Sequence, residues 1–159
     1  INLLSYDYFM KYLVILIISF TNLSFSIDLT RQTPIEKTVY LKGKIGLNHF
    51  YEPSELIFYT GKLYKLIIKN VSDSKHYFGS ELFAKSIFTR KIQLTKNFNK
   101  VAEIKGIINE VEVWPNEALE WWFVPIKTGI FLDLKCNVKD NETQLNHSEM
   151  GMKGKIIIK

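Results

Sequence analysis

Short runs of alternating polar and apolar residues, separated by turn residues, recur along this chain. They limit the folds that it can adopt more than any other feature of the sequence does. Residues 38–47 (TVYLKGKIGL) alternate in their first half, and residues 55–70 (ELIFYTGKLYKLIIKN) divide into two such runs around Thr60-Gly61. Further runs flank Pro115-Asn116, and KGKIIIK closes the sequence. Alternation with a period of two is typical of a strand with one buried face, and glycine, proline and asparagine mark turns between strands. About seven or eight short strands therefore predict an all-β fold, an antiparallel β-sandwich.

Residues 77–90 interrupt this strand rhythm. Apolar and polar residues recur there at helical spacing, namely Leu82, Phe83, Ser86, Ile87 and Arg90. Ser80 precedes them and is a residue type that caps helix N-termini. We expect one short helix or irregular excursion between strands.

The N-terminal segment differs from the rest of the chain. Lys11 is followed by the apolar run YLVILIISF and then by TNLSFS, in which small residues stand two apart. A basic start, a short apolar stretch and a small-x-small site are typical of a secretory signal peptide. We interpret Met10 as the initiator, residues 1–26 as upstream residues and signal peptide, and residues 27–159 as one domain. The expected location is periplasmic or otherwise exported, and an uncleaved segment would instead anchor the protein in a membrane.

The charge of the chain is moderately basic, with a net value of +5 and a pI near 9.2. The lysines are scattered, which is typical of a solvated surface, although a basic face could also steer an anionic partner or contact a membrane surface. No nucleic-acid-binding motif accompanies this charge, so we expect no nucleic-acid partner.

The single cysteine, Cys136, needs an explanation in an exported protein. Thiols in an oxidising compartment usually form disulfides, and this chain offers no second cysteine. An intermolecular link, a buried inert side chain, a reactive thiol and a metal ligand are the alternatives. Strict alternation would place Cys136 on the same side of its strand as Ile130, Leu132 and Leu134. That apolar face predicts a shielded thiol and favours a metal ligand.

The residues around Cys136 resemble those of a known family. HSEMGMKGKIIIK follows the strand that ends in the cysteine, and NVSDSKHYF lies upstream. This order resembles the cupredoxins, the small blue-copper proteins of the plastocyanin and azurin type, over residues 39–159. The resemblance implies a Greek-key β-sandwich that holds one type 1 copper ion. Its ligands would be His76, Cys136, His147 and Met152.

The chemistry of these donors suits copper independently of the resemblance. A thiolate and two imidazoles with a weak thioether form a geometry that both Cu(I) and Cu(II) accept. Zinc also accepts cysteine and histidine, but the thioether favours copper. Met150 remains an alternative to Met152, because both lie on one side of an extended segment. His49 matches no ligand of the family, so we expect it to be structural or exposed.

Ten residues separate Cys136 from His147, where the family usually has two to four. Lengthening a loop from four to ten residues costs roughly 0.8 kcal/mol, so length alone does not forbid the site. We expect this polar loop to be mobile. We also expect Trp114, Trp121 and Trp122 to fill the sandwich, with one of the adjacent pair facing outward.

Three functions follow from these residues. The first is a monomeric one-electron carrier that transforms no substrate, exchanges electrons with redox protein partners, and passes them through the His147 ring, as the resemblance implies. The second is a copper delivery or holding protein for a copper-accepting oxidase, and a metal-free interaction module is a further alternative. An enzyme with Cys136 as nucleophile is disfavoured, since a reactive thiol sits at a helix N-terminus or in a cationic pocket rather than at the apolar end of a strand.

Overall fold

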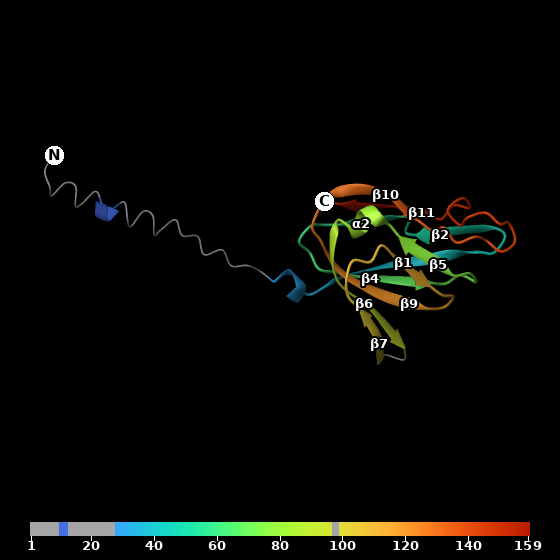
Figure 1. The fold of residues 1–159 in the computed structure, drawn as a ribbon, viewed down its shortest axis with the longest axis horizontal. Coiled ribbons are helices and arrows are strands. Elements are labelled where there is room, and N and C mark those ends of the chain that lie inside the picture. Colours follow the sequence, from blue (N-terminus) through green and yellow to red (C-terminus); the bar gives the residue numbers. More distant parts are fainter. Residues whose placement is uncertain (1–9, 13–27, 97–98) are drawn as a thin grey trace.

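Two β-sheets face each other in the computed structural model, which describes residues 10–12, 28–96 and 99–159 (Figure 1). In order across the first sheet, the strands are β2 (Asn48–Glu52), β1 (Ile35–Lys44), β4 (Tyr64–Asn70), β9 (Ala118–Pro125), β6 (Ile87–Lys96) and β7 (Asn99–Ile104). Across the second, they are β3 (Glu55–Phe58), β11 (Lys153–Ile158), β10 (Gly129–Lys135), β5 (His76–Gly79) and β8 (Glu110–Val113). The β1–β4 and β3–β11 pairs are parallel and the other pairs are antiparallel, so the predicted all-β sandwich is confirmed.

The core lies between the sheets and is built from alternate residues of the central strands. On β4 the inward residues include Leu66 and Ile68, and on β9 they include Trp121 and Phe123. Each of these side chains is at most 1% exposed. Burying one large apolar side chain contributes about 1.5–3 kcal/mol, so this strand pair stabilises the centre of the sandwich.

Only one of the three tryptophans fills the core. Trp121 is buried, whereas the adjacent Trp122 faces the other side of the sheet with Lys91 Nζ 4.8 Å from its ring centre. Trp114 is 60% exposed, because it follows the end of β8 where the chain turns at Pro115. The expectation for Trp121 and Trp122 is therefore confirmed, and the expectation for Trp114 is wrong.

The predicted helical excursion is present between β5 and β6 as α2 (Glu81–Ala84). The Ser80 hydroxyl caps it by accepting the Phe83 backbone N–H at 3.1 Å. Phe83 then enters the core against Trp121 and Phe123. A further helical turn, η1 (Leu29–Arg31), precedes β1.

A bulge in β10 overturns the expected alternation of this strand. The register with β11 shifts between Phe131 and Leu134, and both of these side chains are buried. Ile130 and Leu132, expected on the buried face, are 67% and 72% exposed. Because a bulge inserts an extra residue, the parity of the strand reverses across it. Cys136 lies beyond the bulge and is buried as predicted.

The segment between β10 and β11 returns beside β2 at one end of the sandwich (Figure 1). Most of the expected signal peptide lies outside the described residues. In the part of the chain that is described, no helix combines the length and the apolar character that crossing a bilayer requires.

Candidate metal centre

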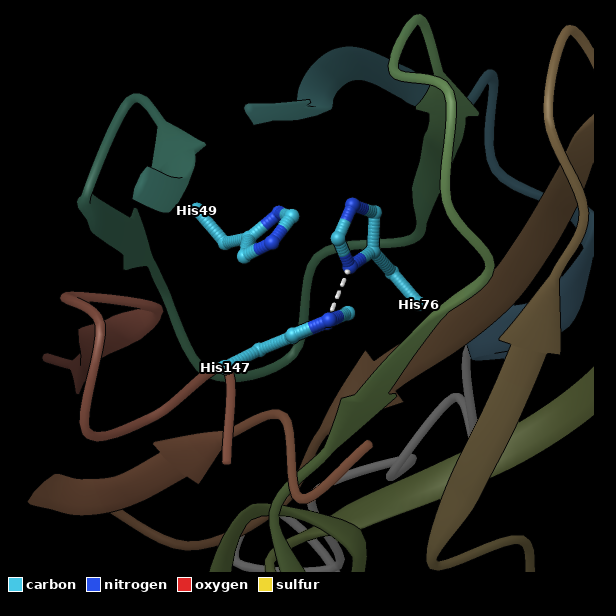
Figure 2. Close-up of side chains that lie close together, drawn as sticks. All are labelled: His49, His76 and His147. Atoms are coloured by element: carbon cyan, nitrogen blue, oxygen red, sulfur yellow. Dashed lines mark hydrogen bonds between the residues drawn. The ribbon is translucent and has the colours of Figure 1, made fainter. Parts of the chain in front are cut away.

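Three histidines and the cysteine converge at this end of the sandwich. His76 opens β5, Cys136 directly follows β10, His147 lies between β10 and β11, and His49 belongs to β2. All four side chains are fully buried. Each imidazole places a nitrogen within 4.8 Å of the other two, and Figure 2 shows the three rings gathered around one space.

The donor atoms of three predicted ligands lie at spacings that suit a shared metal ion. The Nδ1 atoms of His76 and His147 are 3.0 Å apart, and Cys136 Sγ lies 3.9 Å and 3.6 Å from them respectively. Metal bonds of about 2.0 Å to nitrogen and about 2.3 Å to sulfur would separate two nitrogens by about 3.0–3.5 Å, and nitrogen from sulfur by about 3.5–3.9 Å. The donor set therefore fits one ion without rearrangement.

A hydrogen-bond chain fixes the orientation of His76. Its Nε2 lies 2.8 Å from the Ser72 hydroxyl, which itself donates to Asn70 Oδ1 or to the Ser74 carbonyl. The hydroxyl has a single proton, so it accepts from His76 Nε2–H. His76 Nδ1 consequently carries the lone pair, which accepts a hydrogen bond from His147 Nδ1 at 3.0 Å in the metal-free protein (Figure 2). Such outer hydrogen bonds orient metal-binding imidazoles.

The Cys136 sulfur and the His147 ring are held by backbone contacts. The Tyr77 N–H donates to Cys136 Sγ at 3.3 Å, a contact that favours a thiolate. The His147 N–H donates to the Val138 carbonyl at 2.8 Å. His147 Nε2 is buried and finds no hydrogen-bond partner among the described residues.

Met152 lies directly against the other ligand segments through its main chain. Its N–H donates to the His147 carbonyl at 2.8 Å, and its carbonyl accepts from the Cys136 N–H at 3.2 Å. The Met152 side chain is fully buried. The sulfur of Met150 instead accepts the Thr143 hydroxyl at 3.3 Å, on the loop. This arrangement favours Met152 over Met150 as the thioether donor.

The long segment between Cys136 and His147 is a closed hairpin rather than the expected mobile loop. Lys139 and Asn146 form a β-bridge, and the Asp140 N–H donates to the Leu145 carbonyl at 2.8 Å. The added residues are thus folded back on themselves, and they bring His147 beside Cys136.

Asp140 is the anchor of this hairpin and is almost fully buried. Its Oδ1 accepts the backbone N–H groups of Glu142 at 3.0 Å and Thr143 at 2.8 Å, and also the Thr143 hydroxyl. Its Oδ2 accepts the Gly46 N–H at 3.0 Å and lies 3.1 Å from His49 Nε2. The N–H groups of Thr143 and Gly46 hold the pKa of Asp140 well below its ordinary value, so the carboxylate stays ionised.

His49, for which the sequence predicts a structural or exposed position, is buried beside the proposed ligands, a place that the sequence did not indicate. Its ring stacks on His147 with 3.7 Å between centres and 27° between planes. His49 and Tyr51 share the buried face of β2, a weak signal in the sequence. The glycine at position 43 is a stronger signal. Gly43 (φ +141°) pairs with His49, and any larger residue would place a Cβ 2.6 Å from His49 Nδ1.

Burial and mutual repulsion keep the ligand imidazoles neutral. Burial, followed by the neighbouring imidazoles, lowers the pKa of His76 to about 3. Burial, followed by His49, lowers the pKa of His147 to about 4. Burial raises the pKa of the Cys136 thiol, with the Tyr77 N–H acting in the opposite direction. At neutral pH the metal-free pocket therefore presents two neutral imidazoles and a protonated thiol, and binding a metal would release the thiol proton.

Comparison with known proteins identifies the architecture. No family model matches this sequence, and no curated protein matches it. A multicopper oxidase from Campylobacter jejuni superimposes with a TM-score of 0.54 at 18% identity, over 80% of this chain and 30% of that one. A multi-copper oxidase from Pediococcus acidilactici superimposes with a TM-score of 0.57 at 19% identity, over 86% of this chain and 28% of that one. A copper nitrite reductase from Nitrosomonas europaea superimposes with a TM-score of 0.55 at 8% identity, over 85% of this chain and 52% of that one.

This is the cupredoxin fold. The resemblance drawn from the sequence around Cys136 is confirmed at the level of architecture. The chain spans less than a third of the length of the two oxidases, and a likeness at under 20% identity concerns the cupredoxin fold alone.

Within this cupredoxin fold, His76, Cys136, His147 and Met152 lie together at one end of the sandwich, and their role as metal ligands stays a prediction. The His147 ring, through which the resemblance implies that electrons would pass, is fully buried.

Proposed function

We propose that this protein binds one copper ion through His76, Cys136 and His147, with Met152 as a weak thioether donor, and carries single electrons. The observation that supports this most directly is the spacing of the three donor atoms, two of them nitrogens 3.0 Å apart, in a fully buried pocket. Copper bound there would supply a Cu(I)/Cu(II) couple with one preferred geometry for both states.

The residues of this chain would keep that geometry unchanged during electron transfer. The Asn70–Ser72 chain holds the His76 ring, and the Tyr77 N–H holds the sulfur. The backbone bonds of Met152 join the segments that carry Cys136 and His147. A site that does not rearrange between oxidation states exchanges electrons with little reorganisation, which is what a carrier requires.

The same burial argues against an enzyme. Each donor side chain is fully covered, so no substrate reaches it without a rearrangement of the protein. A nucleophilic cysteine has a lowered pKa, whereas burial raises the pKa of Cys136. We therefore propose a non-enzymatic protein, exported by the segment at residues 10–26, that serves redox protein partners as a monomer.

Copper titration of the purified protein tests this proposal. Wild type should turn intensely blue with one equivalent of Cu(II), because of charge transfer from the Cys136 thiolate. Cys136→Ser should bind without that colour, since a hydroxyl does not provide the thiolate donor. Met150→Leu is the matched control and should stay blue. A colourless wild-type complex would rule out a type 1 site.

A copper delivery protein is the second candidate, and the cover over His147 favours it. A carrier with a fully buried ligand ring needs its partner to reach the metal through an intervening side chain. A donor would instead open the pocket and release Cu(I). Incubating the Cu(I) protein with a Cu(I) chelator separates the two, because a carrier retains the ion over repeated redox cycles and a donor loses it.

A further inference from the structure

The His49 ring lies over the proposed metal pocket but has no part in the proposed ligand set. We propose that this ring covers one face of His147 and keeps water and small anions away from the metal, while Asp140 holds the ring in place. This inference rests on the proposed copper site and adds how access to that site is controlled.

The stacking geometry supports a covering role. His147 turns its Nδ1 toward Cys136 Sγ, so its Nε2 edge faces away from the sulfur. That edge is buried without a hydrogen-bond partner in the described part of the chain, although a solvated imidazole would bond to water there. The centres of the His147 and His49 rings are 3.7 Å apart with 27° between their planes, so His49 covers one face of His147. His49 therefore occupies space through which solvent would otherwise approach His147.

The orientation of His49 argues against a role as a further ligand. Imidazole lone pairs lie in the plane of the ring, and two rings only 27° from parallel do not aim their lone pairs at one point between them. His49 Nε2 is already in contact with Asp140 Oδ2 at 3.1 Å. His49 Nδ1 has no hydrogen-bond partner among the described residues, but it lies beside Gly43, where an added Cβ would approach it within 2.6 Å.

Asp140 positions the ring because it is itself rigidly held. Its carboxylate joins the turn between β1 and β2, through the Gly46 N–H, to its own hairpin, through the N–H groups of Glu142 and Thr143. The His49 N–H also lies 3.5 Å from the Met150 carbonyl. The covering ring is thus fixed on both sides, by β2 and by the segment that carries His147.

Two substitutions of His49 separate the ring from its hydrogen bond. His49→Ala removes the cover, whereas His49→Phe keeps a ring of similar size that cannot bond to Asp140. Ile92→Ala is the matched control, since it removes buried volume on β6 without altering a residue of the metal pocket. Circular dichroism and thermal unfolding should first establish that each variant is folded.

The first readout uses the copper-loaded full-length protein and sodium azide. Azide should leave the visible and paramagnetic resonance spectra of wild type, His49→Phe and Ile92→Ala unchanged. In His49→Ala it should shift both spectra in a saturable way, because the anion then reaches the metal. An azide response in wild type, or none in His49→Ala, would overturn the proposal.

The second readout uses the metal-free protein and does not depend on copper. Diethyl pyrocarbonate modifies accessible imidazoles, and peptide mapping gives its rate at His147. We expect a rate at least about tenfold higher in His49→Ala than in wild type, with His49→Phe and Ile92→Ala close to wild type. Equal rates in wild type and His49→Ala would contradict the cover, and so would a His49→Phe rate that matches His49→Ala.

The two readouts distinguish failure of this inference from failure of the proposed function. If wild type binds no copper but His49 still protects His147, the copper function fails and the cover stands. If wild type is blue and azide reaches its metal, the copper function stands and the cover fails. Altered copper resonance parameters in His49→Phe without azide would show that His49 is a ligand and would also overturn the proposal.

Discussion

At the scale of single residues, the proposed donor side chains are already oriented in the metal-free protein. The Nε2–H of His76 donates to Ser72, so the lone pair of the ring lies on Nδ1, beside Cys136 and His147. The order of cysteine, histidine and methionine in the sequence predicted four of the residues that the structure brings to this end of the sandwich. The Ser72 contact was not identified, because a serine in a turn cluster carries no signal for its hydrogen-bond partner.

Removing the Ser72 hydroxyl should weaken copper binding without removing a ligand. Removing a hydrogen bond to the nitrogen of a metal-binding imidazole that does not hold the metal typically lowers metal affinity about 10–100-fold, so we expect a loss in that range for Ser72→Ala. Competition with a chelator of known affinity would measure it. Ser74→Ala is the matched control, because the Ser74 hydroxyl makes only a 3.4 Å contact with the Lys75 carbonyl. Wild-type affinity in Ser72→Ala would show that the hydroxyl does not orient His76.

At the scale of elements, β2 and the hairpin before His147 are joined around His49 and Asp140. These two residues stand 91 positions apart, and no local pattern relates them. The sequence indicated correctly that the segment is long and polar, but the hydrogen bonds of the Asp140 carboxylate make it an ordered hairpin. The bulge in β10 could not be predicted from the sequence either. Ile130 and Leu132 continue the apolar alternation of a strand, although both are exposed in the structure.

Gly43→Ala should disturb this junction more than an equivalent change elsewhere. Gly43 has a φ of +141°, and a Cβ there would lie 2.3 Å from the Asn48 carbonyl oxygen. The unfavourable backbone alone costs about 1–3 kcal/mol, and the collision with Asn48 adds to it. Gly106→Ala is the matched control, since Gly106 has a φ of +132° and a Cβ added there would meet no described atom within 4 Å.

Urea unfolding of the two glycine variants would compare their free energies of unfolding. We expect the larger loss in Gly43→Ala, together with weaker copper binding, because His49 lies directly against the added methyl group. An equal loss of stability in both variants would mean that the strand β2 moves aside to accommodate the methyl group.

At the scale of the whole molecule, the sandwich was predictable because its signals are local. Alternation over residues 55–70 and turn residues such as Pro115 suffice to indicate short strands, and Ser80 indicated the helix. The pairing of the strands is a property of the folded chain. The parallel β1–β4 and β3–β11 pairs bring together segments that share no sequence pattern.

The metal-free protein should lose stability in mild acid. The folded state lowers the pKa of His76 to about 3 and of His147 to about 4, while an unfolded histidine titrates near 6.5. Below pH 6.5 the unfolded chain therefore binds protons that the folded chain does not. The free energy of unfolding should fall between pH 6.5 and about 4, by about 1.4 kcal/mol per pH unit for each imidazole.

Thermal or urea unfolding at a series of pH values would measure this slope. His147→Gln should show a shallower slope than wild type over the same range, because it keeps only one of the two strongly shifted ligand histidines. A stability that does not change between pH 6.5 and 4 would contradict the burial of neutral imidazoles in the folded protein.

The position of β11 bears on the order in which the proposed site can assemble. This strand is an interior one, placed between β3 and β10, and Cys136, His147 and Met152 all lie in the stretch between the end of β10 and the start of β11. The second sheet is incomplete until Lys153–Ile158 pair with β3 and β10. A chain synthesised only as far as β10 would present His76 without the other three side chains, so copper binding through all four, as proposed, would come only after Met152 has been synthesised.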